Sequence, residues 1–190
     1  MIDKLRRQGD ALTILFADET HVRQDSAHMR GYSPKGVAPR LDQSADTAAH
    51  SAASLLIGIS TKGAMTYTMS ERTCGADAFI GFLRQVRTAH PAGRICVVLD
   101  NARIHHAKAV RAYLEEDPLL ELLFLPPYAP DINPVELFNN ALKTEIRKKA
   151  VMSRKDLIAF ARDFMDGKSD AEEYFRSFFG TEKTRYANVV

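Results

Sequence analysis

The sequence predicts an α/β fold in which helices cover a five-stranded mixed sheet, and three observations support this. Residues 54–60 and 64–70 alternate apolar and polar side chains on either side of a short turn, which is typical of an antiparallel hairpin. The apolar runs at 94–100 and 119–126 stop abruptly at polar residues or proline, as buried strands do. Residues 76–89, which precede these runs, carry an apolar stripe at helical spacing.

The first half of the chain is expected to supply three strands and one helix. Residues 11–19 read as a strand ending at Asp18, and the polar stretch 20–49 reads as a long insertion of the kind that serves binding. The hairpin follows, with Thr61-Lys62-Gly63 as its turn. In the helix 76–89 the inward side chains are expected to be Phe79, Phe82, Leu83 and Val86, at positions i, i+3, i+4 and i+7.

The second half alternates strands and helices. A strand at 94–100, a helix from about 105 to 116 and a strand at 119–126 should form parallel, right-handed crossovers. Asn133-Pro134 then starts a helix that runs to about 149, with Asn at the N-cap and Pro in the first turn. Two short helices are expected near 153–166 and 169–179.

Length and composition indicate a single globular domain. A chain of 190 residues suits one domain, with its core at about 11–150 and C-terminal helices at 151–180. Two cysteines far apart in sequence form no disulfide framework, which favours a reducing compartment. The apolar run that starts at Leu12 is too short for a membrane span or a signal sequence, so we expect a cytoplasmic protein without membrane contact.

Three acidic residues occupy positions where elements begin or end. Asp18 and Asp100 end the first and fourth predicted strands, and Glu136 lies in the first turn of the helix after the fifth. If the first and fourth strands are neighbours, the three carboxylates come together and repel one another unless cations bind. Mg²⁺ prefers oxygen ligands and keeps several waters, and two such ions form the clamp used for in-line displacement at phosphate.

Each acid also has a structural interpretation. Asp18 and Asp100 fit turn or cap residues, and Asn101 is an equally good cap. Glu136 stands three residues after Asn133, which is capping-box spacing, so its carboxylate has the option of binding the backbone of the N-cap. Spacing alone leaves the catalytic and structural interpretations open.

Four segments together resemble successive blocks of a known family. LFADET, RGYSPKG, VVLDNARIHHA and LPPYAPDINPVELFNNALK resemble the DDE catalytic domain of mariner-like bacterial insertion-sequence transposases, over roughly residues 12–150. The 35 residues that separate Asp100 from Glu136 are a spacing that this family uses. The resemblance implies a ribonuclease H-like fold, with Asp18, Asp100 and Glu136 as catalytic and metal-binding residues and with Asn101 and His105 as site neighbours.

The same resemblance implies an activity and its partners. The expected reaction is DNA cleavage and strand transfer at the ends of a mobile element, with two Mg²⁺ ions for which Mn²⁺ can substitute. Two element ends must be joined, so a homodimer acting on bacterial nucleoid DNA is expected. A related nuclease or resolvase, and an inactive DNA-binding remnant, are the alternatives.

The chain departs from the family pattern in two respects. Members often carry a tryptophan shortly after the catalytic glutamate, whereas Phe138 and Asn139 stand there, which concerns local packing. Full-length members also carry helix-turn-helix modules before the catalytic domain. Met1 lies 17 residues before Asp18, so these modules are expected to be absent.

Basic side chains in two regions are the candidates for DNA contact. Six cations and one acid lie between Lys143 and Lys155, and the expected contacts here are Lys143, Arg147 and Lys148. The insertion contributes Arg30, Lys35 and Arg40. These contacts would position DNA without reading its sequence. For the first region, a solvated helix end whose cations suit the helix C-terminus is an equal alternative.

Overall fold

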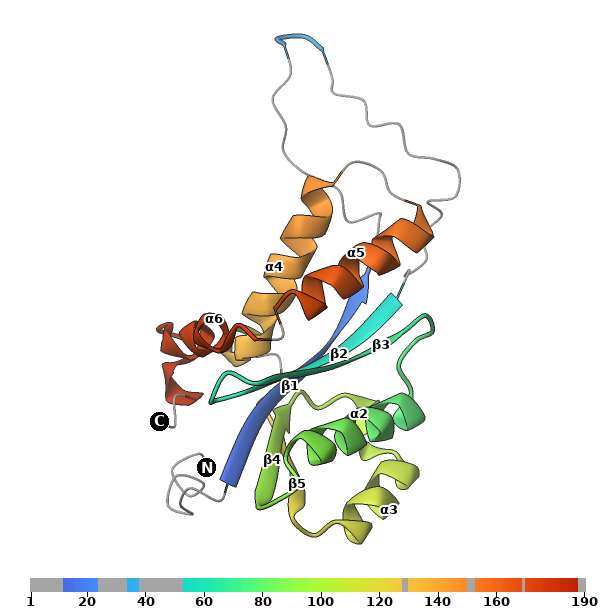
Figure 1. The fold of residues 1–190 in the computed structure, drawn as a ribbon, viewed down its shortest axis with the longest axis vertical. Coiled ribbons are helices and arrows are strands. Elements are labelled where there is room, and N and C mark those ends of the chain that lie inside the picture. Colours follow the sequence, from blue (N-terminus) through green and yellow to red (C-terminus); the bar gives the residue numbers. More distant parts are fainter. Residues whose placement is uncertain are drawn as a thin grey trace.

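The fold is built on one five-stranded sheet. The computed structural model describes residues 12–23, 34–37, 53–127, 130–149, 153–168 and 170–187. The strands are β1 (Leu12–Val22), β2 (Ala53–Ser60), β3 (Met65–Ser70), β4 (Arg94–Leu99) and β5 (Leu120–Phe124), in the spatial order β3-β2-β1-β4-β5 (Figure 1).

The sheet is mixed, as the sequence predicts. β1 pairs with β2 and β2 with β3 in antiparallel fashion, whereas β1 with β4 and β4 with β5 are parallel. Helices lie in the connections of the second half: α2 (Ala76–Ala89) leads from β3 to β4, and α3 (Lys108–Glu116) joins the parallel strands β4 and β5. These elements give the chain a ribonuclease H-like α/β fold.

Two expected boundaries are wrong. β1 does not end at Asp18 but continues to Val22, because the antiparallel partner β2 keeps pairing with it through Val22. The helix expected from His105 begins at Lys108, after a short 3-10 turn at Arg103–His106. Ala107 separates the two with an extended backbone (φ −58°, ψ 146°), which interrupts helical hydrogen bonding.

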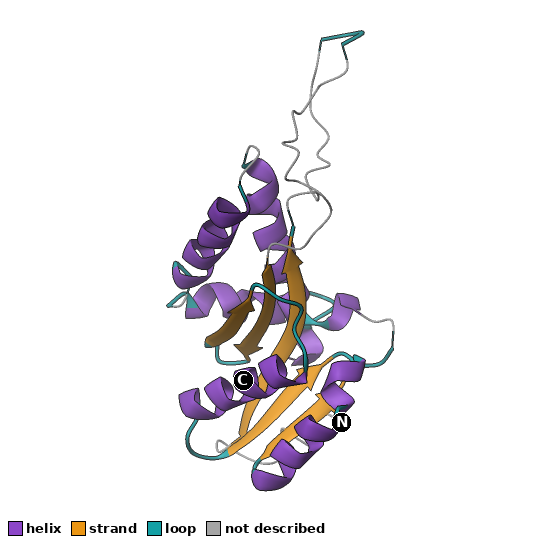
Figure 2. Ribbon diagram, turned by 90° about the vertical axis from the view of Figure 1, so that its right-hand side faces the viewer, coloured by secondary structure: helices purple, strands orange, loops and turns teal. Residues whose placement is uncertain are grey.

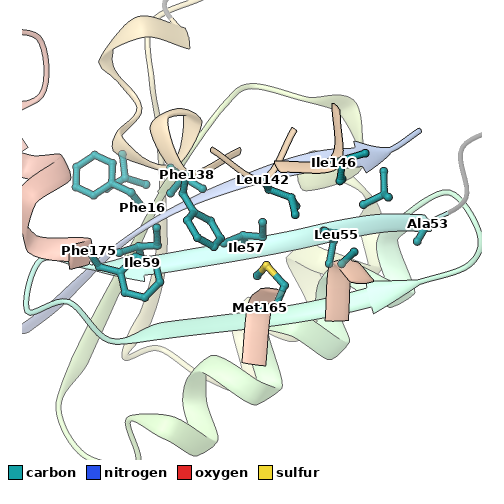
Figure 3. Close-up of a cluster of buried hydrophobic side chains, with 14 of the residues drawn as sticks. Phe16, Ala53, Leu55, Ile57, Ile59, Phe138, Leu142, Ile146, Met165 and Phe175 are labelled. Atoms are coloured by element: carbon teal, nitrogen blue, oxygen red, sulfur yellow. The ribbon is translucent and has the colours of Figure 1, made fainter. Parts of the chain in front are cut away.

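Helices cover both faces of the sheet (Figure 2). One face packs against α2 and α3, where the four predicted inward residues of α2 are fully buried. The other face packs against α4 (Pro134–Lys148), α5 (Arg154–Asp166) and α6 (Glu172–Ser177). Figure 3 shows Phe138 and Leu142 of α4 directed toward Ile57 of β2 within this second core.

The regular alternation of β1 decides which side chains face α4. Ile14 and Phe16 belong to the core beneath α4, whereas Leu15 and Ala17 belong to the core beneath α2. Successive side chains of a strand point to opposite faces, so Asp18 projects on the α4 side.

Two further observations concern the cysteines and the helices. Cys74 and Cys96 are both buried and free. Within the described ranges, no helix has both the length and the apolar character needed to cross a bilayer.

Candidate active site

Asp18 and Asp100 occupy equivalent positions relative to the last shared pair of two neighbouring strands. The last parallel pair between β1 and β4 is Phe16 with Val98. Asp18 follows Phe16 by two residues, and Asp100 follows Val98 by two residues. The neighbouring strands that the sequence interpretation required are therefore present, and both acids lie just beyond the end of their shared ladder.

Glu136 is brought to the same place by the start of α4. The N-cap residue Asn133 accepts a hydrogen bond from the Val135 N–H (3.1 Å), and its Nδ2 donates to the Ala17 carbonyl in β1 (3.0 Å). This second bond fixes the helix start beside Asp18. Glu136 follows in the first helical turn.

The capping-box interpretation of Glu136 receives no support from the described residues. The Asn133 side chain bonds the N–H of Val135, and the Glu136 N–H bonds the backbone carbonyl of Asn133. Within the described ranges, the Glu136 carboxylate makes no hydrogen bond to the helix start. Its negative charge instead contributes to the raised pKa of Asp18.

The three acids interact electrostatically. The pKa of Asp18 is raised from 3.8 to about 7, first by its burial and then by the negative charges of Glu136 and Asp100. A backbone N–H bond from Glu19 and the positive charge of Lys143 oppose this rise in pKa. Both burial and neighbouring negative charges disfavour the ionised form of Asp18, and a bound cation would favour it.

The donor set fits a hard divalent cation. Carboxylate oxygens from three elements are the ligands that Mg²⁺ and Mn²⁺ accept, and waters complete the coordination. Within the described part of the chain, however, no three ligating side chains are already arranged to hold one metal ion. The fold thus places the acids within electrostatic range of one another without a closed coordination shell.

His105 lies beside Asp100. Its Nε2 is 3.3 Å from Asp100 Oδ1, and its ring packs 4.3 Å from the Phe79 ring centroid. Burial lowers the pKa of His105, while the neighbouring Asp100 opposes that change. Asp100 Oδ1 also accepts a hydrogen bond from the Ala102 N–H (3.1 Å), so Asp100 does act as a turn residue. Its side chain is nevertheless 63% exposed.

Asn101 makes a different contact. Its Oδ1 lies 2.5 Å from Nε2 of His106, and the His106 ring packs against Phe124. The structure therefore brings His105, but not the Asn101 amide, into contact with a candidate acid.

Sequence reasoning missed Asn139 as a contact of Asp18. Asn139 is completely buried in the apolar stripe of α4, and its Nδ2 donates to Asp18 Oδ2 (2.6 Å). A polar residue at a position where the helical period requires an apolar one was the available signal. Phe138 is the other residue at which the chain departs from the family pattern. Its ring packs in the core against Phe164 and Phe175.

The predicted DNA-contact residues have different surroundings. Lys143 lies close enough to Asp18 to lower its pKa, whereas Lys148 forms an ion pair with Glu145 (2.6 Å). Arg147 is exposed in the last turn of α4, and Lys35 is exposed in a turn closed by the Val37 N–H and the Pro34 carbonyl. Arg30 and Arg40 lie outside the described residues.

Comparisons with known proteins agree with this fold. The Mos1 transposase in a paired-end complex with the left transposon end superposes with a TM-score of 0.68 at 18% identity, covering 100% of this chain and 57% of that one. The catalytic domain of the Mos1 mariner transposase gives 0.63 at 16% identity, covering 98% and 86%. At such identities the likeness concerns the fold.

Sequence comparison identifies the family. An insertion element IS630 protein of 39 kDa from Shigella sonnei is 31% identical over 90 residues, which are 46% of this chain and 26% of that protein. The chain thus spans about a quarter of this relative and just over half of the Mos1 chain in the paired-end complex. Residues 13–158, most of the chain, match the sequence model of the DDE superfamily endonucleases. The chain belongs to the DDE superfamily endonuclease family.

Proposed function

We propose that this chain is the catalytic domain of a transposase, which cleaves DNA at the ends of a mobile element and transfers the freed strand. The observation that carries the proposal is the convergence of three acids: Asp18 and Asp100 follow the last shared pair of β1 and β4, and Glu136 lies in the first turn of α4, whose start is bonded to β1. Burial first, and then the charges of Glu136 and Asp100, raise the pKa of Asp18 to about 7. Family membership supplies the reaction class, and the Mos1 relatives include complexes with transposon-end DNA and with Mn or Mg.

Asp18, Asp100 and Glu136 are proposed to hold two divalent ions, Mg²⁺ or Mn²⁺. Bound ions of this kind supply the Lewis acidity that activates water and stabilises a leaving oxygen in phosphoryl transfer. The protein's own part is to offer acidic oxygens just beyond the last shared pair of β1 and β4 and at the start of α4. His105 steadies Asp100 through the 3.3 Å contact between its Nε2 and the Asp100 carboxylate.

DNA is proposed to approach across the C-terminal half of α4. Lys143 carries positive charge next to the acids, and Arg147 follows it one turn later. Such cations attract phosphates and position a backbone without reading bases. We further propose a dimer that holds two element ends, acting in the bacterial cytoplasm, where the buried free thiols of Cys74 and Cys96 stay reduced.

A nicking assay with Mg²⁺ or Mn²⁺ tests the catalytic assignment. We expect the wild type to cut supercoiled DNA and Asp100→Asn to lose at least about 100-fold in rate, since each acid is required for phosphoryl transfer. Asp77→Asn, an exposed carboxylate on α2, is the matched control and should cut like the wild type. Equal cutting by the wild type and Asp100→Asn would remove the assignment.

Strand transfer from a pre-cut end separates a transposase from a related nuclease. A transposase joins a supplied 3′-OH end to target DNA in the same metal buffer. A nuclease or resolvase cuts without joining, and an inactive remnant does neither. We expect joined products, and their absence from a preparation that nicks DNA would favour the nuclease alternative.

A further inference from the structure

Asn139 is a buried amide whose hydrogen bond leads to a candidate metal ligand. Its side chain is completely buried on α4, one turn after Glu136, and its Nδ2 donates to Asp18 Oδ2 over 2.6 Å. Its Oδ1 is also buried and has no hydrogen-bond partner among the described residues. The bond to Asp18 is therefore the one hydrogen bond that this amide makes among the described residues and that an apolar side chain could not make.

Burying this amide does not favour folding. A buried polar atom without a partner costs about 1–3 kcal/mol, and one hydrogen bond returns about the same amount or less. The neighbouring positions of the same stripe, Val135, Phe138 and Leu142, are apolar and fully or almost fully buried. A leucine has the same number of side-chain heavy atoms and the same branching, without an orphaned oxygen, so stability alone does not account for asparagine there.

The chemistry of the amide suits the orientation of an acid in an anionic site. A carboxylate accepts hydrogen bonds and an amide nitrogen donates them, so the observed orientation of Asn139 is the one that an ionised Asp18 requires. The backbone N–H of Glu19 supplies a second donor to the same carboxylate. Two donors restrict the rotation of the carboxyl group, and because neither is charged, they leave its negative charge available to a cation.

Hydrogen bonds join α4 to two consecutive residues of β1, Ala17 and Asp18. Asn133 donates to the Ala17 carbonyl at the start of α4, and Asn139 donates to the Asp18 side chain less than two turns later. Glu136 lies between these two contacts. The amide of Asn139 thus couples the orientation of the Asp18 carboxylate to α4, the helix that carries Glu136.

We propose that Asn139 is a positioning residue, which holds the Asp18 carboxylate in the orientation needed to share divalent ions with Glu136. This inference rests on the proposed function. Loss of a partner that orients a metal ligand typically weakens metal affinity by about 10–100-fold. Asn139→Leu should therefore bind Mn²⁺ about 10–100-fold more weakly while it folds as well as the wild type or better.

The test is a Mn²⁺ titration of the 190-residue chain, followed by electron paramagnetic resonance of the free ion. The compared proteins are the wild type, Asn139→Leu, Asn139→Ala and the control Asn140→Ala, which changes the adjacent, exposed asparagine of the same helix. Asp18→Asn sets the affinity expected when a ligand is lost. Thermal unfolding in a chelator reports stability separately.

The outcomes are distinct. The proposal expects both Asn139 variants to lose Mn²⁺ affinity, Asn140→Ala to keep it, and Asn139→Leu to keep its unfolding midpoint in chelator. A merely structural role would lower the midpoints and leave the Mn²⁺ affinity of folded protein within about twofold of wild type, which would overturn the inference. If the wild type binds Mn²⁺ no better than Asp18→Asn does, the proposed metal site itself fails, and the inference fails with it.

Discussion

Asp18 is the residue at which folding opposes ionisation most clearly. Its carboxyl group is half-buried, and two further carboxylates act on it, so its pKa rises from 3.8 to about 7. The folded protein therefore keeps this proton in a pH range where the unfolded chain has lost it. Ionising Asp18 without a cation costs stability, which is the usual trade-off at a functional site.

Asp18→Asn is expected to stabilise the metal-free protein above neutral pH. Because the folded-state pKa lies above the unfolded one, the wild type loses stability as pH rises from about 4 to about 7, and neutral asparagine does not. One pKa unit corresponds to about 1.4 kcal/mol, and each kcal/mol shifts the midpoint of a chain of this size by about 2–4 °C. Thermal unfolding in chelator between pH 4 and 8 measures the difference.

The control for this experiment is Asp77→Asn, which also removes one negative charge but lies exposed in the first turn of α2. It should show no gain that grows with pH. Adding Mg²⁺ at pH 8 should raise the midpoint of the wild type and not that of Asp18→Asn, since a ligand stabilises only the state that binds it. A pH-independent difference between Asp18→Asn and the wild type would contradict the proposed electrostatic cause.

At the scale of elements, the start of α4 is the feature on which the site depends. Asn133 attaches it to β1, and two contacts from the C-terminal segment hold the turn before it. Tyr186 donates its hydroxyl hydrogen to the Ile132 carbonyl (2.8 Å), and Lys183 pairs with Asp131 (2.6 Å). Both residues lie in the C-terminal segment, beyond position 158, where the match to the family model ends.

Asn133→Ala should lower the free energy of unfolding by about 1–3 kcal/mol, because the helix loses its cap and the Ala17 carbonyl loses a donor. Ser153→Ala is the matched control, since Ser153 caps α5 at an exposed position through the Asp156 N–H. Its cost should be about 1 kcal/mol or less. Urea unfolding of both variants measures the difference, and equal losses would show that the tie to β1 contributes nothing.

At the scale of the molecule, the two faces of the sheet have different roles. The face under α2 and α3 is packed by apolar side chains, whereas the face under α4 carries Asp18 beyond its apolar residues. Cations follow along α4, beginning with Lys143 near the acids. Acidic and basic groups thus succeed one another along one helix, an arrangement that suits a phosphate backbone entering a metal site.

DNA binding is expected to weaken steeply with salt, because cations on α4 replace counterions of the phosphates. Changing Arg147 and Lys148 to glutamine should reduce the slope of log K against log salt by about 2 if both contact phosphate. Lys108 and Arg111, exposed on α3 over the other face, provide the control pair. Fluorescence anisotropy over a salt series measures the slopes, and an unchanged slope in the α4 variant would place the DNA elsewhere.

Local patterns in the sequence predicted most elements correctly. The hairpin with Gly63 in its turn, the helix Ala76–Ala89 and the Asn133 cap all rest on interactions within a few residues, namely periodicity, turn chemistry and capping. Family blocks in the sequence also singled out the three acids, and the register of β1 with β4 places two of them two residues beyond the last shared pair. The metal-binding role of these acids stays a prediction.

Only the tertiary structure decided which distant side chains meet. The continuation of β1 past Asp18 depends on pairing with β2, and the Asn139 bond to Asp18 depends on how α4 crosses the sheet. The position of Lys143 near the acids has the same origin. Short-range periodicity fixes the face on which a residue lies, but the partner that it meets there is set by strand register and helix packing between segments more than 100 residues apart.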